Sequence, residues 1–375
     1  MEGTNKFIYN ITIKLLLLAL IVAMLKLAQP VLLPLAVAIL FTFLLLPISQ
    51  KLENWGLHRG FAIVLSLLLA ALVVVGILYF FYSQVLMFVN DWPQLSEQMS
   101  AKIDKLFVWV SDNFNYSEVE QKNWINERLQ SAGSSAATYA LGIFSATGSF
   151  IASVALLPIF IFFLTYYRDK YKHFVELMAG DEVKARNTLR IIRKIAHVSQ
   201  GYLKGLFFVI VILSVLNSTG FFILGLRHAF LFGVLLAFLN IIPYIGVLIG
   251  SILPVAMALI TEDQIGIAIG VLAVCIFVQF LENNFITPNV VGSSVSINPF
   301  TAILGLTTSA LIWGVVGMII ALPFIGMIKV AFDNIGPLKP WGYLLGEEKS
   351  FRHSAKDSRR KFQFRKRYNK ESESS

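Results

Sequence analysis

The chain carries little charge for its length. Of its 375 residues, 14% are charged and 57% are hydrophobic, whereas soluble domains contain about 25% charged and roughly 45–50% apolar residues. So few charges cannot cover the apolar surface that a soluble globule of this composition would expose. The composition therefore excludes an ordinary water-soluble domain and favours a protein that lies in lipid.

Catalytic and redox signatures are also missing. A single cysteine, Cys275, excludes an internal disulfide framework and a cysteine-rich zinc cluster, and its place in an apolar run predicts a packing role. The sequence contains no phosphate-binding GxxxxGK(S/T), no HExxH and no GxSxG pattern. We therefore expect neither an enzyme nor a bound cofactor, so any pumping must use an ion gradient or a partner protein.

What the sequence does contain is a series of long apolar runs. A helix needs about 20 apolar residues to cross a hydrocarbon core of about 30 Å, and a helix pairs its backbone groups within the segment. The runs predict an all-α, polytopic integral membrane protein of about eight transmembrane helices, with a tight turn at Gln29 and Pro30. We expect broken or re-entrant helices in the C-terminal half, where 229–260 and 299–330 either cross once or form re-entrant hairpins. The candidate spans are 9–28, 31–48, 61–82, 148–167, 205–226, 229–260, 265–283 and 299–330.

The distribution of basic residues predicts the orientation of these spans. Residues 168–204 hold nine Lys or Arg against four Asp or Glu, and residues 333–375 hold eleven against six. Residues 83–147 hold four against seven. The positive-inside rule then predicts a multi-pass protein of the bacterial inner (plasma) membrane with both termini in the cytoplasm.

Four parts follow from this pattern. We expect N-terminal transmembrane helices in 1–82, an extracytoplasmic helical segment in 83–147, a transport core in 148–332, and a basic disordered cytoplasmic tail in 333–375. The transport core includes a cytoplasmic basic segment, 168–204. The tail has no recognition fold beside it, so we expect membrane lipids as its partner and no nucleic acid.

Three extramembrane or small-residue segments have helical patterns. In 92–110, apolar residues recur every three or four positions from Leu95 to Val110, with Pro93 in the first turn. Ser117 and Glu120 fit a capping box, and the small residues of 131–149 predict a closely packed helix.

The basic segment 168–204 contains a further amphipathic pattern in 182–199. Its predicted apolar face carries Val183, Leu189, Ile192 and Ala196. Such a helix either lies on an anionic inner leaflet or docks on the helical bundle, and both alternatives stay open.

The most informative interruption of an apolar run is at 240–246. Asn240, Pro243, Tyr244 and Gly246 lie within it. Proline leaves an upstream carbonyl unpaired, and discontinuous membrane helices expose backbone groups to a solute or an ion. The alternative is a kink needed only for packing.

A polar cluster follows at the end of the next span. Gln279, Glu282, Asn283 and Asn284 lie together, and Glu282 is the only carboxylate between Asp263 and Asp333. A carboxylate near hydrocarbon is costly and usually pairs or moves protons. Glu282 is therefore a candidate proton or cation site, unless it lies at the interface and reaches water.

Two further prolines complete the candidate pathway. Pro288 lies in a polar connection that ends at Pro299 and is either a gate or a loop. Pro323 belongs to a faint internal repeat, because the residues 322–326 resemble 242–246. Paired interrupted spans are typical of transporters built from repeats. The alternative is a chance match, because the chain is rich in apolar residues throughout.

These stretches resemble a known family. The N-x-I-P-Y-x-G stretch at 240–246, the Q-x-x-E-N-N stretch that starts at Gln279, and the run 314–323 are similar to the autoinducer-2 exporter family of transporters. Residues 201–205 also resemble the stretch that opens that family's C-terminal half. In one departure, Val247 stands where proline often follows the motif glycine, which affects the expected shape of the break.

The resemblance implies a homo-oligomeric inner-membrane protein. Its members are described as exporters of the quorum-sensing signal autoinducer-2 or as sodium- or lithium-proton antiporters. The leading hypothesis is a secondary transporter or facilitator that moves a small polar solute outward. The alternatives are a cation-proton antiporter and, from another class, a non-transporting membrane scaffold.

Overall fold

The protein is described here from a computed structural model that covers residues 2–114, 147–242, 245–262, 264–291 and 296–347. Over these residues it consists of helices, and a single isolated β-bridge is the only extended pairing in them. The all-α polytopic prediction is confirmed. The chain forms two compact units: unit 1 comprises 1–47, 160–204 and 292–375, and unit 2 comprises 48–159 and 205–291.

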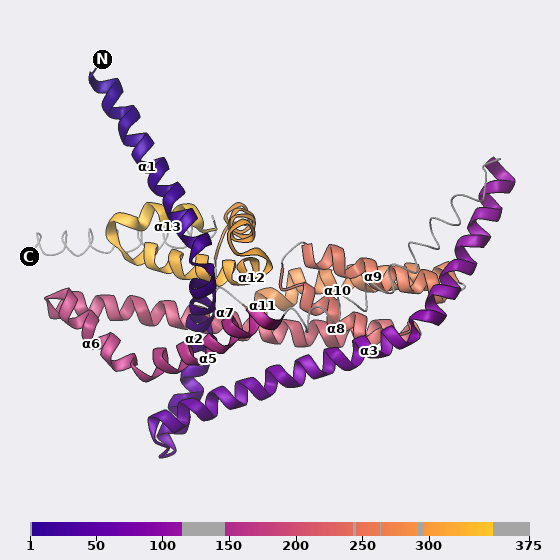
Figure 1. The fold of residues 1–375 in the computed structure, drawn as a ribbon, viewed down its shortest axis with the longest axis horizontal. Coiled ribbons are helices and arrows are strands. Elements are labelled where there is room, and N and C mark those ends of the chain that lie inside the picture. Colours follow the sequence, from indigo (N-terminus) through magenta and orange to yellow (C-terminus); the bar gives the residue numbers. More distant parts are fainter. Residues whose placement is uncertain (1, 115–146, 243–244, 263, 292–295, 348–375) are drawn as a thin grey trace, which may run out of the picture. The chain divides into compact units, whose positions relative to one another are not determined.

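The first two helices form a bent column rather than a hairpin, so the predicted tight turn is wrong. Helix α1 (Glu2–Leu27) and helix α2 (Gln29–Asn54) are separated only by Ala28. The Ala28 amide donates to Met24 O at 2.8 Å and the Leu32 amide to Ala28 O at 2.8 Å, so helical bonding continues past the junction. Pro30 falls in the first turn of α2, where proline is tolerated, and Figure 1 shows the two helices in sequence.

Helix α3 (Arg59–Phe114) joins two predicted segments into one. It has 56 residues with Pro93 in its interior, so the expected boundary between span 61–82 and helix 92–110 does not exist. At 1.5 Å per residue it is about 84 Å long, far more than a bilayer core. The predicted apolar face is buried at Leu95. The capping box at Ser117 and the segment 131–149 lie outside the described residues, apart from 147–149, which begin α5.

The middle of the chain contains a span, a short helix and a long helix. These are α5 (Thr147–Tyr166), α6 (Arg168–Ala179) and α7 (Glu182–Ile223). The basic pattern 182–199 and the span 205–226 are thus parts of one 42-residue helix. Within unit 1, Ile195 and Leu203 pack against a cluster that includes Ala36 and Ile320, so this stretch of α7 docks on the bundle.

The predicted apolar face of 182–199 is only partly correct. Val183 is 66% exposed and Ile192 40% exposed, whereas Ala185 is buried. The face that packs is therefore rotated from the predicted one, because tertiary contacts select the side that meets α2 and α12.

Helices α8 (Ala229–Leu239) and α9 (Ile245–Thr261) form an antiparallel hairpin in unit 2 (Figure 1). A Cβ at Gly246 would overlap the carbonyl of Leu239, and one at Gly250 would press on Leu236. Residue numbers therefore rise along α9 as those of its neighbours fall along α8, so the chain reverses direction between the two helices. Helix α8 is only about 16 Å long, so the run 229–260 is a hairpin of two short helices rather than one long helix.

Helix α12 (Pro299–Asn334) also reverses, within unit 1. Trp313 and Gly314 leave the helical conformation, and Gly314 has φ 63°. A Cβ at Gly305 would overlap Ile325, a residue that a straight helix would place about 30 Å away. The runs 229–260 and 299–330 are therefore both helical hairpins.

Helix α10 (Ile265–Leu281) continues through a π-helical turn, η1 (Glu282–Ile286), into helix α11 (Thr287–Val290). Its Cys275 is 5% exposed within the main core of unit 2, so the predicted packing role fits. That core also contains buried residues of α3, α7, α8 and α9: Leu95, Phe221, Leu226, Ala229, Phe232, Leu236, Met257 and Ala258.

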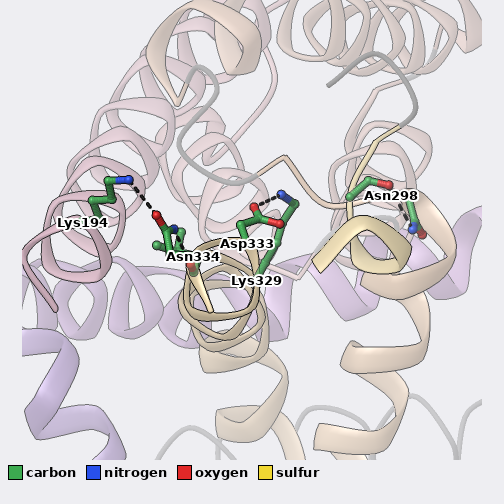
Figure 2. Close-up of polar contacts among 7 residues, drawn as sticks. Lys194, Asn298, Lys329, Asp333 and Asn334 are labelled. Carbon is green, nitrogen blue, oxygen red and sulfur yellow. Dashed lines mark hydrogen bonds and ion pairs between the residues drawn. The ribbon is translucent and has the colours of Figure 1, made fainter. Parts of the chain in front are cut away.

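The segment after α12 is folded up to residue 347, so the expected disorder from 333 onward is wrong there. A 3₁₀ turn, η3 (Gly336–Leu338), leads into helix α13 (Lys339–Leu345). Asn298 caps α12 through Thr301 N at 2.8 Å, and its Nδ2 donates to Leu344 O at 2.7 Å. Figure 2 shows Asn298 and, separately, the Lys329–Asp333 ion pair of 2.6 Å. The rest of the tail lies outside the described residues.

Candidate functional site

Unit 2 contains a small polar cleft beside the turn of the α8–α9 hairpin. We call it the amide cleft; its cavity volume is about 10 Å³, close to the space that one water molecule needs. Its lining residues are Leu213, Asn217, Leu236, Asn240, Val247, Cys275, Val278 and Gln279. Three side-chain amides, from α7, the hairpin turn and α10, thus meet among apolar neighbours.

Two predicted residues, Asn240 and Gln279, lie 39 positions apart in the sequence and line this one cleft. Asn240 terminates α8, where its backbone amide donates to Leu236 O at 3.0 Å. Gln279 is in the last turn of α10. The hairpin turn and the end of α10 therefore form a common polar surface.

Asn217 is a site residue that the sequence reasoning missed. It is 3% exposed on α7, and its Oδ1 is buried without a hydrogen-bond partner among the described residues. A buried acceptor left unpaired costs about 1–3 kcal/mol, so this oxygen favours a donor from a solute or water. Asn217 lies in an apolar stretch of a predicted span, where a lone asparagine was the available signal.

Gly246 allows the hairpin to close. Because any Cβ there would overlap Leu239 O, only glycine lets α9 approach the end of α8 so closely. This role is structural, and it positions Asn240 and Val247 at the cleft. The predicted Pro243 and Tyr244 lie outside the described residues.

Glu282 belongs to a hydrogen-bond chain that extends from the cleft. Gln279 Nε2 donates to Glu282 Oε2 and, at 3.1 Å, to Asn283 Oδ1. Thr287 Oγ1 donates to Glu282 Oε1 at 2.9 Å. Glu282 is half-buried, so both its carboxylate oxygens accept hydrogen bonds next to an amide that lines the cleft.

Asn284 does not join this chain. Its side chain is exposed and its Nδ2 donates to Phe280 O at 2.8 Å, one turn back on α10. Of the four polar residues predicted here, Gln279 alone lines the cleft, Glu282 and Asn283 bind Gln279, and Asn284 points away.

Pro288 explains the π-helical turn. Proline has no amide hydrogen and its ring clashes with the carbonyl four residues earlier. The turn Glu282–Ile286 avoids this clash by widening, and the Thr287 amide donates to Glu282 O, five residues back. Single π-turns of this kind are frequent at functional sites. The predicted irregular connection at Pro288 is thus a widened helix rather than a loop.

Pro323 lies in unit 1, buried in the second arm of α12. The chain reverses in α12 at Trp313 and Gly314, ten residues earlier. The two hairpins therefore do not match as the repeat of 242–246 and 322–326 suggested, since 322–326 lie inside a helical arm, whereas α8 ends at Leu239 and α9 begins at Ile245.

An ionic junction ties the start of the hairpin to α3. Asp91 Oδ2 lies 3.2 Å from Arg227 Nη2 and 3.1 Å from His228 Nε2. Arg227 also donates to Gln94 Oε1 at 3.0 Å. Burial lowers the pKa of His228, against the smaller opposing effect of Asp91. His228 precedes α8 with φ 58°, an uncommon conformation for a non-glycine residue.

The chemistry available in the amide cleft is hydrogen bonding to an uncharged or weakly charged group. Its lining includes no Asp, Glu, Lys or Arg. Over the described residues, no group of three or more His, Cys, Asp or Glu side chains is arranged to hold a metal ion. Among the residues that the structure describes, five helices are long and apolar enough to cross a membrane by length and composition, and three shorter apolar helices accompany them.

These features define the class: a multi-pass helical membrane protein with a polar cleft at a hairpin turn. The sequence profile described as "AI-2E family transporter" matches residues 15–336. The chain therefore belongs to the AI-2E transporter family.

Bacterial relatives span most of the chain. YueF of Bacillus subtilis is 24% identical over 80% of this chain and 83% of its own length. MT0215 of Mycobacterium tuberculosis is 28% identical over 82% of each. Both are named as candidate transport proteins. The AI-2 transport protein TqsA of Escherichia coli is 21% identical over 87% of this chain and 92% of its own length.

Proposed function

We propose that this protein is a secondary transporter or facilitator that moves a small polar solute out of the cell across the bacterial inner membrane. The observation that carries the proposal is the amide cleft, where three amides from separate elements meet beside the turn of a helical hairpin. Turns of interrupted helices at membrane depth are found where they face protein or a water-filled path.

The proposed binding step uses Asn217, Asn240 and Gln279. Asn217 Oδ1 accepts a hydrogen bond from the solute, while the amides of Asn240 and Gln279 offer both donors and acceptors. The α8–α9 hairpin is the element that changes position, because its two arms are joined to the rest of unit 2 only at one end.

Glu282 is the proposed coupling residue. Gain of a proton removes the negative charge that accepts the Gln279 hydrogen bond, which frees the Gln279 amide to bind solute. This links solute binding to a proton gradient through one hydrogen bond. It also explains why a lone carboxylate stands beside an otherwise uncharged cleft.

The test is flux of candidate solutes into or out of proteoliposomes, with and without a proton gradient. We expect Glu282→Gln to abolish gradient-driven flux while the purified protein keeps its elution volume and helix content. Glu97→Gln, an exposed carboxylate on α3, is the matched control and should transport normally. Unchanged flux in Glu282→Gln would remove this residue from the mechanism.

The first solute to assay is autoinducer-2, because the relative TqsA is named for AI-2 transport. The uncharged lining of the amide cleft supports a neutral hydrogen-bonding solute of this kind. A panel of small polar solutes should accompany it. If only another solute is transported, the proposal of a transporter stands and autoinducer-2 is rejected as its substrate.

A sodium- or lithium-proton antiporter is the second candidate. Glu282 favours it, since a carboxylate with two hydrogen-bonded oxygens is able to exchange a proton for a cation. Release of protons from the purified protein on addition of sodium would support antiport. Flux of neutral solute without such release would support export.

The remaining proposals concern the orientation of the protein in the membrane, its oligomeric state and its partners. We propose that both termini are cytoplasmic, because α6, the first half of α7 and the tail are basic. We also propose that the protein is a homo-oligomer, that it is not an enzyme, and that it binds no cofactor or nucleic acid.

A further inference from the structure

Helix α6 has an apolar side that the rest of the described chain leaves uncovered. None of its 12 residues is buried. Tyr171 is 46% exposed, Phe174 59% and Met178 73%. Large side chains with this much exposure on a short helix require a covering surface, since an isolated helix of this length is marginal in water.

The exposed side chains form one narrow stripe. Tyr171, Phe174 and Met178 are spaced by three and four residues, and Tyr167, just before the helix, extends the row by one more turn. At 100° per residue all four lie within about 60° of one another around the axis. Asp169, Lys172 and Glu176 occupy the opposite side, with Lys172 and Asp169 paired at 2.8 Å.

The stripe begins where an apolar helix ends. Helix α5 ends at Tyr166, and Tyr167 alone separates it from α6. Gly180, in the left-handed conformation with φ 63°, ends α6 and turns the chain toward α7. Tyrosine is enriched at the membrane–water interface, so a tyrosine-bearing stripe at the end of a span is suited to that depth.

The adjoining part of α7 supplies positive charge. Arg186, Arg190 and Arg193 follow one another at four- and three-residue spacing and are all exposed. They lie on the side of α7 away from Ala185 and Ile195, which pack inward. Lys194 donates to Asn334 Oδ1 of α12 at 2.7 Å, and Figure 2 shows this contact between α7 and α12.

We propose that α6 and the arginine row of α7 form an interfacial hairpin that binds the headgroups of anionic phospholipids. The stripe enters the boundary between headgroups and acyl chains, and Arg186, Arg190 and Arg193 lie close enough to the surface to attract lipid phosphate. The charge argues against a second copy as the occupant. Residues 168–204 carry nine basic against four acidic side chains, so two such lobes would repel each other.

The experiment places a polarity-sensitive dye at a single cysteine of the full chain in nanodiscs. In a Cys275→Ala background, Phe174→Cys reports on the stripe and Glu176→Cys on the opposite side of the same helix. Discs of phosphatidylcholine alone are compared with discs that also contain phosphatidylglycerol. We expect a blue shift and a stronger signal at 174 but not at 176, only in the anionic discs, and its loss in high salt.

Charge neutralisation completes the test. Arg190→Gln with Arg193→Gln should lower the salt concentration at which the shift at 174 is lost. Met178→Cys is a second reporter if Phe174→Cys fails to fold. Equal signals at 174 and 176 would overturn the proposal, as would equal shifts in both lipids. Shielding of 174 in detergent, with self-quenching between labelled copies, would show that another copy covers the stripe.

Discussion

Single side chains determine the character of the amide cleft. Asn217 and Gln279 are amides rather than charged groups, and each lies in a stretch of its helix that carries no charge. Membrane helices tolerate such residues when they have partners. The unpartnered Oδ1 of Asn217 is therefore the residue-scale feature that most clearly favours binding over packing.

Substitution of Asn217 separates binding from stability. Asn217→Leu has a similar volume and removes the unpaired acceptor, so we expect an unfolding temperature in detergent that is unchanged or raised. We expect transport efficiency at low solute concentration to fall about 2- to 10-fold, which corresponds to the loss of one hydrogen bond to the solute. Thr219→Val, an exposed polar residue on the same helix, is the control. A large loss of stability in Asn217→Leu would assign the side chain to packing.

At the scale of elements, the π-helical turn connects sequence to site geometry. Pro288 forces the widened turn, and the turn brings Thr287 within hydrogen-bond reach of Glu282, which already faces Gln279 three residues earlier. A regular helix has 3.6 residues per turn. If this π-turn became a regular α-helical turn, Glu282 would rotate by about 100° relative to Thr287.

We expect Pro288→Ala to let α10 and α11 join as a regular helix. The protein should keep its helix content and elution volume but lose part of its gradient-driven flux, because Thr287 no longer donates to Glu282. Pro158→Ala in α5 is the matched control, since it alters a proline in another apolar helix. Normal flux in Pro288→Ala would separate the π-turn from transport.

The junction of α3 with α8 has a predicted pH dependence. The pKa of His228 is lowered in the folded protein, so the unfolded chain binds its proton more readily. Stability is then complete above the unfolded pKa of about 6.5 and decreases as pH falls toward the lower folded pKa. His228→Asn keeps a residue that tolerates φ 58° and should flatten this dependence in unfolding temperatures measured from pH 7.5 to 5. An unchanged slope would mean that other groups control acid stability.

At the scale of the whole molecule, the two hairpins change how the chain crosses the bilayer. Eight apolar runs suggested eight passes, but 229–260 and 299–330 are each a helical hairpin. The apolar stretches outside these hairpins are 9–28, 31–48, 61–82, 148–167, 205–226 and 265–283, and the first two belong to the one bent column of α1 and α2.

Cysteine labelling tests this topology. Ile223, at the end of α7, and Gln264, just before α10, flank the α8–α9 hairpin and are exposed. In a Cys275→Ala background, we expect a membrane-impermeant maleimide to reach Ile223→Cys and Gln264→Cys from the same side of sealed, oriented vesicles. Labelling from opposite sides would mean that 229–260 crosses once.

The sequence by itself determined the membrane class, the helical content and the place of the polar residues along the chain, because lipid requires long apolar helices and makes each polar interruption costly. It also pointed to Asn240, Gln279 and Glu282 before any contact was known. Only the tertiary structure decided that Asn217 joins them and that Pro323 does not share their cleft. It alone showed that α8 and α9 turn back on each other. Apolar periodicity is the same for a crossing helix and for two short helices in a hairpin, so direction depends on packing at single positions such as Gly246.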